Sequence, residues 1–475
     1  MDNRFYFGFN TSEERKKRRK AELYSMSEQV STFFWDEAPQ HGLEMREGQQ
    51  DMSFEIVDAL INDQHFAIEA GVGIGKSFGY LVPVLLYSKR MNKPVIIATS
   101  TIALQEQLWR DVHAVMPLLG LNRDVILAKG QTHYLCNKRA DEYMCDPKAD
   151  PPDALKEGIK QGYEERKDFP EVLPQGVWDK VNVQRFSMKN CGSCEKKCKY
   201  YKVRAALKFT DGVVLCNQDF LTQHLMKLRR GQEGLINAAA DLLVVDEAHN
   251  LDDKVRSATT ERFGQGMLFG MIKSAFYELR SFDQSSVSGE KREAESAIIA
   301  FYNCLKAQVQ KQINEAEQDM RYADRFFFDN NGSAIELLTE MNAAIHNLSS
   351  SIQIYSSMDF RNNRSFAASD DLDAVSESLS ELLDRIDDML IWIEQHGSNT
   401  ELVYCPKNTK EIVSRLYFNG DERTILTSAT LTNATSGSLE EQYSYFISNT
   451  GFPVGERGCL SEPKPSPYPY DEHAM

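Results

Sequence analysis

The sequence has no apolar run that could cross a membrane, because its longest apolar stretches, such as residues 80–87, fall far short of the 18 or so residues that a span needs. We also expect no secretory signal, since the basic run at residues 15–20 is not followed by an apolar segment and a cleavage site. Basic residues are not in excess: 54 lysines and arginines stand against 70 acidic residues, a net charge of −16. We therefore expect a cytoplasmic protein without membrane contact, and the overall charge argues against one that coats nucleic acid.

The 475 residues are enough for about three domains of ordinary size. Short apolar strands alternate with helical stretches, and this alternation predicts an α/β fold with a doubly wound parallel sheet. The strands are expected at residues 66–70, 94–100, 124–130, 212–217, 241–247 and 423–429.

Two stretches interrupt the alternation. Residues from 136 to about 207 are polar and rich in lysine, whereas residues from 252 to about 400 repeat their apolar positions with a helical period. In the second stretch we expect amphipathic helices at 267–280, 295–313, 334–355 and 372–396. The simplest organisation is an N-terminal tail at 1–40 and one core domain in three parts, 41–130, 209–251 and 401–462, with insertions at 131–208 and 252–400.

A glycine-rich loop between a predicted strand and a predicted helix is the strongest motif. It consists of Ala70, Gly71, Val72, Gly73, Ile74, Gly75, Lys76 and Ser77. Successive backbone N–H groups in such a loop bind phosphate, and the N-terminus of the following helix adds its positive dipole. Lys76 would neutralise the β- and γ-phosphates and the Ser77 hydroxyl would bind Mg²⁺. Ala70 stands where the strict pattern begins with glycine.

Paired carboxylates end a second apolar strand about 170 residues after this loop, in the tetrapeptide Asp246-Glu247-Ala248-His249. Asp246 can hold Mg²⁺ through water, and Glu247 can polarise an attacking water. Together with the glycine-rich loop, this spacing predicts a nucleoside triphosphatase, with Lys76, Asp246 and Glu247 as its catalytic residues.

Two further motifs support the same site. Ser428-Ala429-Thr430 lies at another strand end, where small hydroxyl residues can link a γ-phosphate to a bound polymer. Upstream of the loop, Arg46 and Gln49 share a short segment. The amide of Gln49 can bond an edge of adenine; the alternative is a glutamine on the surface of a helix.

Nine cysteines, an odd number spread over a long chain, do not form a disulfide framework. Cys191, Cys194 and Cys198 lie within eight residues, which is a metal-ligand spacing. A fourth thiolate would complete either a zinc site or an iron–sulfur site, and the chemistry alone leaves both open. Around them, residues 185–208 hold eight lysines and arginines, one glutamate, and the aromatics Phe186, Tyr200 and Tyr201. This pattern favours contact with single-stranded DNA over a solvated loop.

Six segments occur in an order that resembles the XPD/DinG-like iron–sulfur DNA helicases of superfamily 2: EAGVGIGKS, ATSTIALQEQL, KGQTHYLC, the cysteine cluster, VVDEAH and LTSATL. The resemblance extends from about residue 40 to 475. It implies a P-loop NTPase (RecA-like) motor domain that carries an inserted iron–sulfur domain and an inserted helical arch domain. It also implies ATP-dependent 5′→3′ translocation on single-stranded DNA, with a role in DNA repair.

The resemblance further assigns residues to two sites. The nucleotide site would comprise Arg46, Gln49, residues 70–77, Asp246, Glu247 and His249, with Mg²⁺ on Ser77 and Asp246. A [4Fe–4S] cluster would be held by Cys136, Cys191, Cys194 and Cys198, with Cys145 as an alternative ligand.

Helicases of this family have two motor domains, and only about 42 residues follow the segment SATLTN (residues 428–433) here. Residues 463–475 resemble the start of a second motor domain. We therefore expect a truncated chain or one half of a split enzyme, which is nearly inert alone because loss of an arginine finger typically lowers the rate by ~10³–10⁵. The alternative is a non-catalytic module that binds nucleotide and DNA. A related exonuclease is disfavoured, since too few residues precede Arg46 for a nuclease domain.

Overall fold

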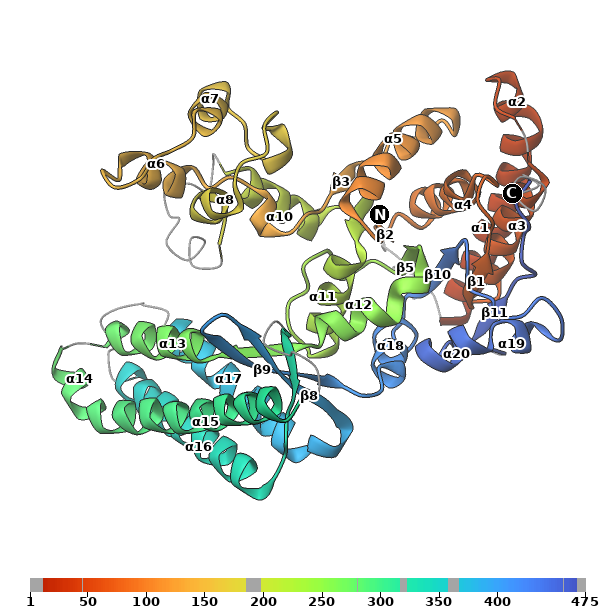
Figure 1. The fold of residues 1–475 in the computed structure, drawn as a ribbon. Coiled ribbons are helices and arrows are strands. Elements are labelled where there is room, and N and C mark those ends of the chain that lie inside the picture. The colour runs from red at the N-terminus through yellow and green to blue at the C-terminus, as the bar shows by residue number, and fades with distance from the viewer. Residues whose placement is uncertain are drawn as a thin grey trace, which may run out of the picture. The chain divides into compact units, whose positions relative to one another are not determined.

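A computed structural model describes residues 12–44, 46–184, 198–279, 281–316, 323–357, 367–455 and 457–467. The chain divides into two compact units, the first formed by Met1–Ala258 with Thr409–Met475 and the second by Thr259–Asn408 (Figure 1). Among the helices in the described ranges, none combines the length and the apolar character that a membrane span requires.

A parallel sheet forms the centre of the first unit, as the alternation of strands and helices predicts. Its seven strands follow the order β11-β1-β10-β5-β2-β4-β3, and every neighbouring pair is parallel. Their bounds are β1 His65–Glu69, β2 Val95–Thr99, β3 Val125–Leu127, β4 Val213–Asn217, β5 Leu242–Asp246, β10 Arg423–Ser428 and β11 Gly458–Leu460. The α/β prediction is confirmed, and β11 is an edge strand that the sequence did not predict.

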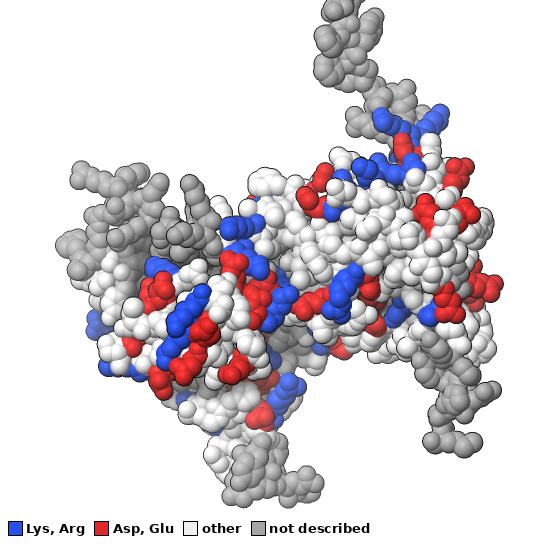
Figure 2. Space-filling view, turned by 90° about the horizontal axis from the view of Figure 1, so that it is seen from above, with Lys and Arg blue, Asp and Glu red and all other residues white. Residues whose placement is uncertain are grey.

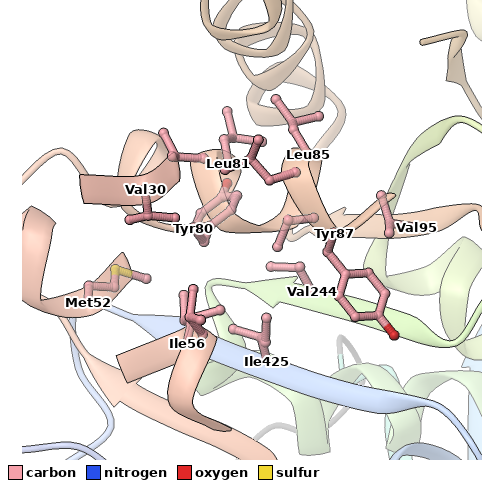
Figure 3. Close-up of a cluster of buried hydrophobic side chains, with 14 of the residues drawn as sticks. Val30, Met52, Ile56, Tyr80, Leu81, Leu85, Tyr87, Val95, Val244 and Ile425 are labelled. Atoms are coloured by element: carbon pink, nitrogen blue, oxygen red, sulfur yellow. The ribbon is translucent and has the colours of Figure 1, made fainter. Parts of the chain in front are cut away.

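Helices cover both faces of this sheet, because successive residues of each strand point to opposite sides. On one face, Val95 and Ile97 of β2 pack in a core with α3 (Glu47–Ile61), α4 (Lys76–Met91) and α5 (Ile102–Leu118), as Figure 3 shows for the part around Tyr80 and Leu81. On the other face, Ile96 and Ala98 lie in a second core. Its helices are α11 Gln218–Arg229, α12 Leu251–Ala258, α18 Lys410–Tyr417, α19 Leu439–Gln442 and α20 Ser444–Thr450.

The N-terminal stretch that the sequence suggested as a tail contains helix α1 (Ser12–Thr32). It continues into a π-helical turn, η1 (Phe33–Glu37), and the short α2 (Ala38–Gln40). Leu23, Met26 and Val30, which follow the helical period, are fully buried in the core that α3 and α4 share. The described part of this stretch is therefore a layer of the first unit.

A small subdomain follows β3 and carries the cysteine segment. Its elements are η2 Gln131–His133, α6 Asn137–Cys145, α7 Asp153–Gln161, η3 Arg166–Asp168, α8 Gln175–Val181 and α10 Lys199–Phe209. Trp178 is buried at the centre of its own core, with Leu155 and Phe169. Gly158 has no room for a side chain, because a Cβ there would lie 2.2 Å from the Phe169 ring.

The second unit combines helices with an antiparallel sheet in the order β6-β9-β8-β7. Its elements are β6 Glu261–Gly264, α13 Gln265–Glu278, α14 Ser281–Ser286, α15 Ser288–Glu315, β7 Arg325–Phe327, α16 Gly332–Ser357, α17 Ala367–Asp384, η5 Ile386–Asp388, β8 Met389–His396 and β9 Asn399–Pro406. The prediction of one helix over 372–396 is wrong in its second half. There the apolar run Ile391–Trp392–Ile393 pairs with β9 as a strand, a choice that a short apolar run does not reveal.

Candidate functional site

Three neighbouring strands bring the predicted motifs to one edge of the parallel sheet. Strands β1, β10 and β5 lie side by side, and the register pairs Glu69 with Ser428 and Thr427 with Asp246. Since parallel strands end at the same edge, the glycine-rich loop, the Asp246–Glu247 pair and the SAT motif meet there. This edge is where ligands bind in open α/β sheets.

The glycine-rich loop is supported from outside by the segment that carries Arg46 and Gln49. Gly73 and Gly75 have φ angles of 89° and 86°, so both adopt the left-handed region that glycine favours. The Gln49 amide donates to the carbonyl of Gly75 at 2.9 Å, and the Arg46 guanidinium donates to the carbonyl of Gly73. A Cβ on Gly75 would lie 2.5 Å from Gln49 Nε2, so this support requires glycine at residue 75.

Lys76, the first residue of α4, forms an ion pair with the predicted catalytic carboxylate. Its Nζ lies 3.0 Å from Glu247 Oε1. The neighbouring Asp246 is within 3.3 Å of the Tyr80 hydroxyl, which donates to Oδ2. Burial, together with repulsion from Glu247, raises the pKa of Asp246 to about 6, against the opposing effect of the Lys76 ammonium. An ammonium and two carboxylates thus share one small space beside the glycine-rich loop.

The backbone of Glu247 is held in an unusual conformation. Its φ and ψ of 56° and 46° place a residue with a side chain in the left-handed region, which costs about 1–3 kcal/mol. The buried Gln218, at the start of α11, donates from Nε2 to the carbonyls of Asp246 at 2.7 Å and Glu247 at 3.0 Å. These two hydrogen bonds hold the turn after β5. The sequence did not single out Gln218; its position directly after a predicted strand was the available signal.

His249 and Ser428 connect the Asp246–Glu247 strand with the SAT motif. The imidazole Nδ1 of His249 lies 2.6 Å from Ser428 Oγ and 3.4 Å from Glu247 Oε2. The Ser428 hydroxyl is also 3.5 Å from Glu247 Oε2, and it accepts from the backbone N–H of Thr430 at 3.3 Å. His249, assigned to the nucleotide site from the sequence, therefore contacts the SAT motif through Ser428.

Glu69, another residue that the sequence did not single out, ends β1 directly before the glycine-rich loop. Its Oε2 accepts from the backbone N–H groups of Leu431 and Thr432, each at 2.6 Å, and from the Thr432 hydroxyl at 2.8 Å. Its backbone carbonyl accepts from Lys464, whose own carbonyl accepts from Gly71. The segment after β11 therefore runs beside the start of the loop.

Oxygen atoms suitable for Mg²⁺ lie close to one another at the start of α4. Ser77 lies beside Tyr80 and Asp111, and burial raises the pKa of Asp111. Mg²⁺ is bound in proteins through one or two carboxylates, hydroxyl groups, water and the phosphates themselves. Ser77 and Asp246, each in contact with Tyr80, fit such a site beside Lys76.

Two of the four predicted cluster cysteines lie in one small apolar cluster of the cysteine subdomain. Cys136 and Cys198, which immediately precede α6 and α10, pack there with Tyr134, Val183 and Tyr200. Cys191 and Cys194 lie outside the described residues, and within the described part of the chain no three metal-binding side chains converge. The alternative ligand Cys145 is exposed at the other end of α6.

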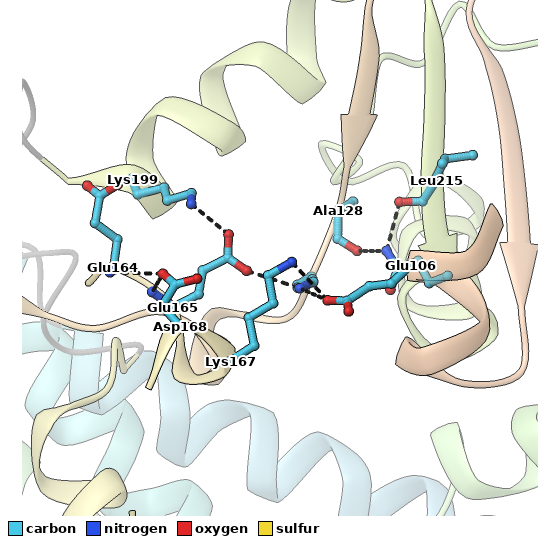
Figure 4. A network of polar contacts seen from close by, with 10 residues as sticks. Glu106, Ala128, Glu164, Glu165, Lys167, Asp168, Lys199 and Leu215 are labelled. Carbon is cyan, nitrogen blue, oxygen red and sulfur yellow. Dashed lines mark hydrogen bonds and ion pairs between the residues drawn. The ribbon is translucent and has the colours of Figure 1, made fainter. Parts of the chain in front are cut away.

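A charged network joins the cysteine subdomain to the parallel sheet (Figure 4). The Lys129 ammonium, on a side chain only 3% exposed, lies 2.9 Å from Glu106 of α5 and 3.0 Å from Glu165. Lys199, next to Cys198, contacts the same Glu165 at 2.8 Å. Beside this network is a cleft of about 640 Å³ whose walls include Trp109, Arg110 and Lys202.

The described part of the basic stretch is partly neutralised. Lys199 and Lys208 pair with carboxylates, and Arg204 donates to a backbone carbonyl. Tyr200 is buried against Tyr134, whereas Tyr201 is 44% exposed. On the face that Figure 2 shows, basic and acidic side chains are interspersed. Within residues 198–208, the positive charge available for a polyanion is therefore concentrated on fewer side chains than the sequence suggested.

Comparison with known proteins gives a consistent picture. Residues 132–266 match the DEAD_2 family. The chain is 24% identical to the "Probable ATP-dependent helicase YpvA" of Bacillus subtilis, over 93% of this chain and 68% of that protein. It is 26% identical to "3'-5' exonuclease DinG" of Bacillus subtilis, over 91% and 50%, and 30% identical to "ATP-dependent DNA helicase YoaA" of Escherichia coli, over 48% and 36%. The chain thus spans between about a third and two thirds of these relatives.

Proposed function

The chain is a member of the DinG-like family of superfamily 2 helicases, and from this premise we propose that its first unit binds ATP with Mg²⁺ and uses ATP hydrolysis to move along single-stranded DNA. The observation that supports this proposal is the convergence of Lys76, Asp246 and Glu247 beside the glycine-rich loop. The direction 5′→3′ and a role in DNA repair belong to the same proposal, on the strength of the family resemblance.

Each residue of the site has a role that its contacts allow. The N–H groups of the loop and Lys76 bind the phosphates, while Ser77 and Asp246 supply oxygen atoms for Mg²⁺. Gln49 Nε2 is engaged by Gly75, which leaves Oε1 to accept from the adenine amino group. Arg46 fixes the loop through Gly73. His249 connects the nucleotide site with the SAT motif through its contact with Ser428.

Hydrolysis in this arrangement depends on the ion pair between Lys76 and Glu247. A γ-phosphate in the loop would compete with Glu247 for the Lys76 ammonium, which lies 3.0 Å from Oε1. The carboxylate released in this way can orient and polarise a water molecule toward the phosphorus, and Lys76 can stabilise the charge on the phosphoryl oxygens. Mg²⁺ held by Ser77 and Asp246 would supply further positive charge there.

Binding of a fluorescent ATP analogue in the presence of Mg²⁺ tests the nucleotide site. Lys76→Ala is expected to weaken binding by about tenfold or more, because a charge-assisted contact contributes roughly 1.5–3 kcal/mol. Lys89→Ala, in the last turn of the same helix, is the matched control and should bind like wild type. Equal affinity for all three proteins would refute the assignment.

A single-turnover ATPase assay, with and without single-stranded DNA, separates the enzyme from a non-catalytic module that binds nucleotide and DNA. Glu247→Gln should retain nucleotide affinity and lose hydrolysis, because the amide cannot polarise water as the carboxylate does. Because the chain alone is expected to be nearly inert, the wild type should hydrolyse ATP slowly and Glu247→Gln more slowly still. Equal hydrolysis rates in the two proteins, with nucleotide binding retained, would favour the module.

For the single strand, we propose a contact at the cleft beside the cysteine subdomain. Lys202 and Arg110 can bind phosphate there and Trp109 can stack on a base. Lys202→Ala should weaken DNA binding and reduce the dependence of log Kd on log salt by about 0.7, the value for one phosphate contact of single-stranded DNA. Lys160→Ala, on the exposed side of α7, is the control. An unchanged salt dependence for Lys202→Ala would place the strand elsewhere.

The third part of the proposal is a [4Fe–4S] cluster on Cys136, Cys191, Cys194 and Cys198. Cys136 and Cys198 pack in one cluster of side chains, which fits two ligands of one metal centre. Cysteine thiolates are the ligands that hold iron–sulfur clusters in proteins. Iron and sulfide analysis of anaerobically purified protein tests it. Cys136→Ser should lose iron and Cys145→Ser should retain it. Stoichiometric zinc without iron would refute the cluster and leave the nucleotide site unaffected.

A further inference from the structure

One carboxylate oxygen of Glu69 binds one short loop. Its Oε2 accepts two backbone N–H groups and one hydroxyl, all from Leu431 and Thr432, at 2.6–2.8 Å. Ionised acceptors make the strongest hydrogen bonds of this kind, and three on one oxygen define the position of the loop closely. Because Glu69 is the residue before Ala70, the loop after the SAT motif is attached to the start of the phosphate-binding loop.

The other end of the same loop is attached to the catalytic carboxylate. Ser428 contacts His249 at 2.6 Å and Glu247 at 3.5 Å, and its hydroxyl also accepts from the N–H of Thr430. Residues 428–432 are therefore held at two points, one on the strand that carries Glu247 and one on the strand that carries Glu69. Between these strands lies β10, which pairs with both.

A bound nucleotide would act on the first of these points. Its phosphates compete with Glu247 for Lys76, and Glu247 is in contact with both His249 and Ser428. A displacement of Ser428 affects residues 429–432 in one of two ways, depending on whether Leu431 and Thr432 are held in place. With Leu431 and Thr432 fixed, the change must be taken up by Ala429 and Thr430; without that fixed point, it spreads along the chain.

We propose that Glu69 is a positioning residue that fixes Leu431 and Thr432, so that nucleotide occupancy at the P-loop changes the conformation of residues 428–432. This role rests on the proposed nucleotide site. Glu69 acts through the loop, and its side-chain hydrogen bonds go to Leu431 and Thr432.

Hydrogen–deuterium exchange of the amides of residues 429–432 tests the proposal, on the full chain with and without ADP–Mg²⁺. In wild type, nucleotide should change the exchange rates of Ala429 and Thr430 by about fivefold or more, since local opening is sensitive to single hydrogen bonds, and should leave Leu431 and Thr432 nearly unchanged. In Glu69→Ala the amides of Leu431 and Thr432 should exchange faster in both states, and the nucleotide-dependent difference at Ala429 and Thr430 should be lost because the change spreads along the chain. Nucleotide affinity, measured separately, should stay within about threefold of wild type.

Two matched variants complete the test. Glu69→Gln places an amide oxygen where Oε2 lies, so it should preserve the response to nucleotide. Glu55→Ala removes a nearby carboxylate that bonds Ser461 and Lys464, not the loop, and should also preserve it. A residue that merely stabilised the fold would raise exchange in both states and leave their difference intact.

The outcomes separate this proposal from the proposed function. If Glu69→Ala retains the wild-type response, or if wild type binds nucleotide without any response, the positioning role is wrong and the nucleotide site stands. If wild type binds no nucleotide, the proposed function fails. Exchange at Leu431 and Thr432 in the free protein then still decides whether Glu69 holds the loop, and an unchanged rate in Glu69→Ala would overturn that too.

Discussion

Gly75→Ala should weaken nucleotide binding severely although it adds one methyl group. Gly75 has a φ of 86°, where an L-residue costs about 1–2 kcal/mol. The new Cβ would lie 2.5 Å from Gln49 Nε2, so the amide must leave and its 2.9 Å bond to the Gly75 carbonyl is lost. That loss adds about 0.5–1.5 kcal/mol. The free loop of the variant relaxes out of this conformation, so nucleotide binding has to restore it at a total cost of roughly 1.5–3.5 kcal/mol, which corresponds to an affinity about 10- to 400-fold lower.

Titration with a fluorescent ATP analogue measures this loss, and Gly162→Ala is the control. Gly162, which ends α7, has a similar φ of 76°, but a Cβ there meets nothing within 4 Å. It should therefore lower stability by about 1–2 kcal/mol in denaturant unfolding and leave affinity unchanged. Gly75→Ala binding within about twofold of wild type would refute both the steric argument and the role of Gln49 in supporting the loop.

Three other perturbations follow from the structure. Burial, helped by neighbouring arginines, lowers the pKa of His224 to about 4. The imidazole is therefore neutral in the native state, whereas in the unfolded chain it is protonated below about pH 6.5. Roughly 3 kcal/mol of folding stability should be lost as the pH falls from 6.5 to 4. Urea unfolding of His224→Gln should show a correspondingly flatter pH dependence, and an unchanged slope would contradict the argument. Leu338→Ala, in the core of the second unit, should lower the free energy of unfolding of that unit by about 2–5 kcal/mol and leave nucleotide affinity unchanged. Loss of both stability and nucleotide affinity would show that the two units are not independent. Glu165→Ala leaves the buried Lys129 with one carboxylate partner and should lower the free energy of unfolding by roughly 3 kcal/mol. Glu106→Ala should cost less, because the Glu106 side chain is 34% exposed. The reverse order of the two variants in denaturant unfolding would count against the network.

The parallel sheet could be predicted because buried parallel strands are continuous apolar runs. The run Val95–Thr99, which is fully buried, is an example. The antiparallel strands of the second unit were missed for a related reason. Ile391–Trp392–Ile393 follows a helical stretch without a glycine or proline between them, so its periodicity alone fits either structure. What decides is the partner strand β9, which the local sequence does not contain.

The site divides in the same way. Lys76, Ser77, Asp246 and Glu247 carry chemistry that sequence spacing reveals, and the structure brings them to one edge of the sheet. Gln218 and Glu69 act on backbone groups of distant segments, through contacts that span 28 and 362 residues of sequence. Backbone N–H and carbonyl groups are the same in every residue, so no motif marks the side chains that bind them.

The order of the strands has a consequence for how the protein is made. Strand β1, which precedes the glycine-rich loop, pairs with β10 and β11, and both lie more than 350 residues further along the chain. About 350 residues separate β1 from β10, so at about 5–20 residues per second a ribosome needs roughly 20–70 s to deliver its partner. During that time β1 has two open edges, while the second unit, contiguous in sequence, can already fold. The nucleotide site therefore cannot be completed before β10 has been synthesised, and a chaperone that shields apolar strands would act on β1 mainly in that interval.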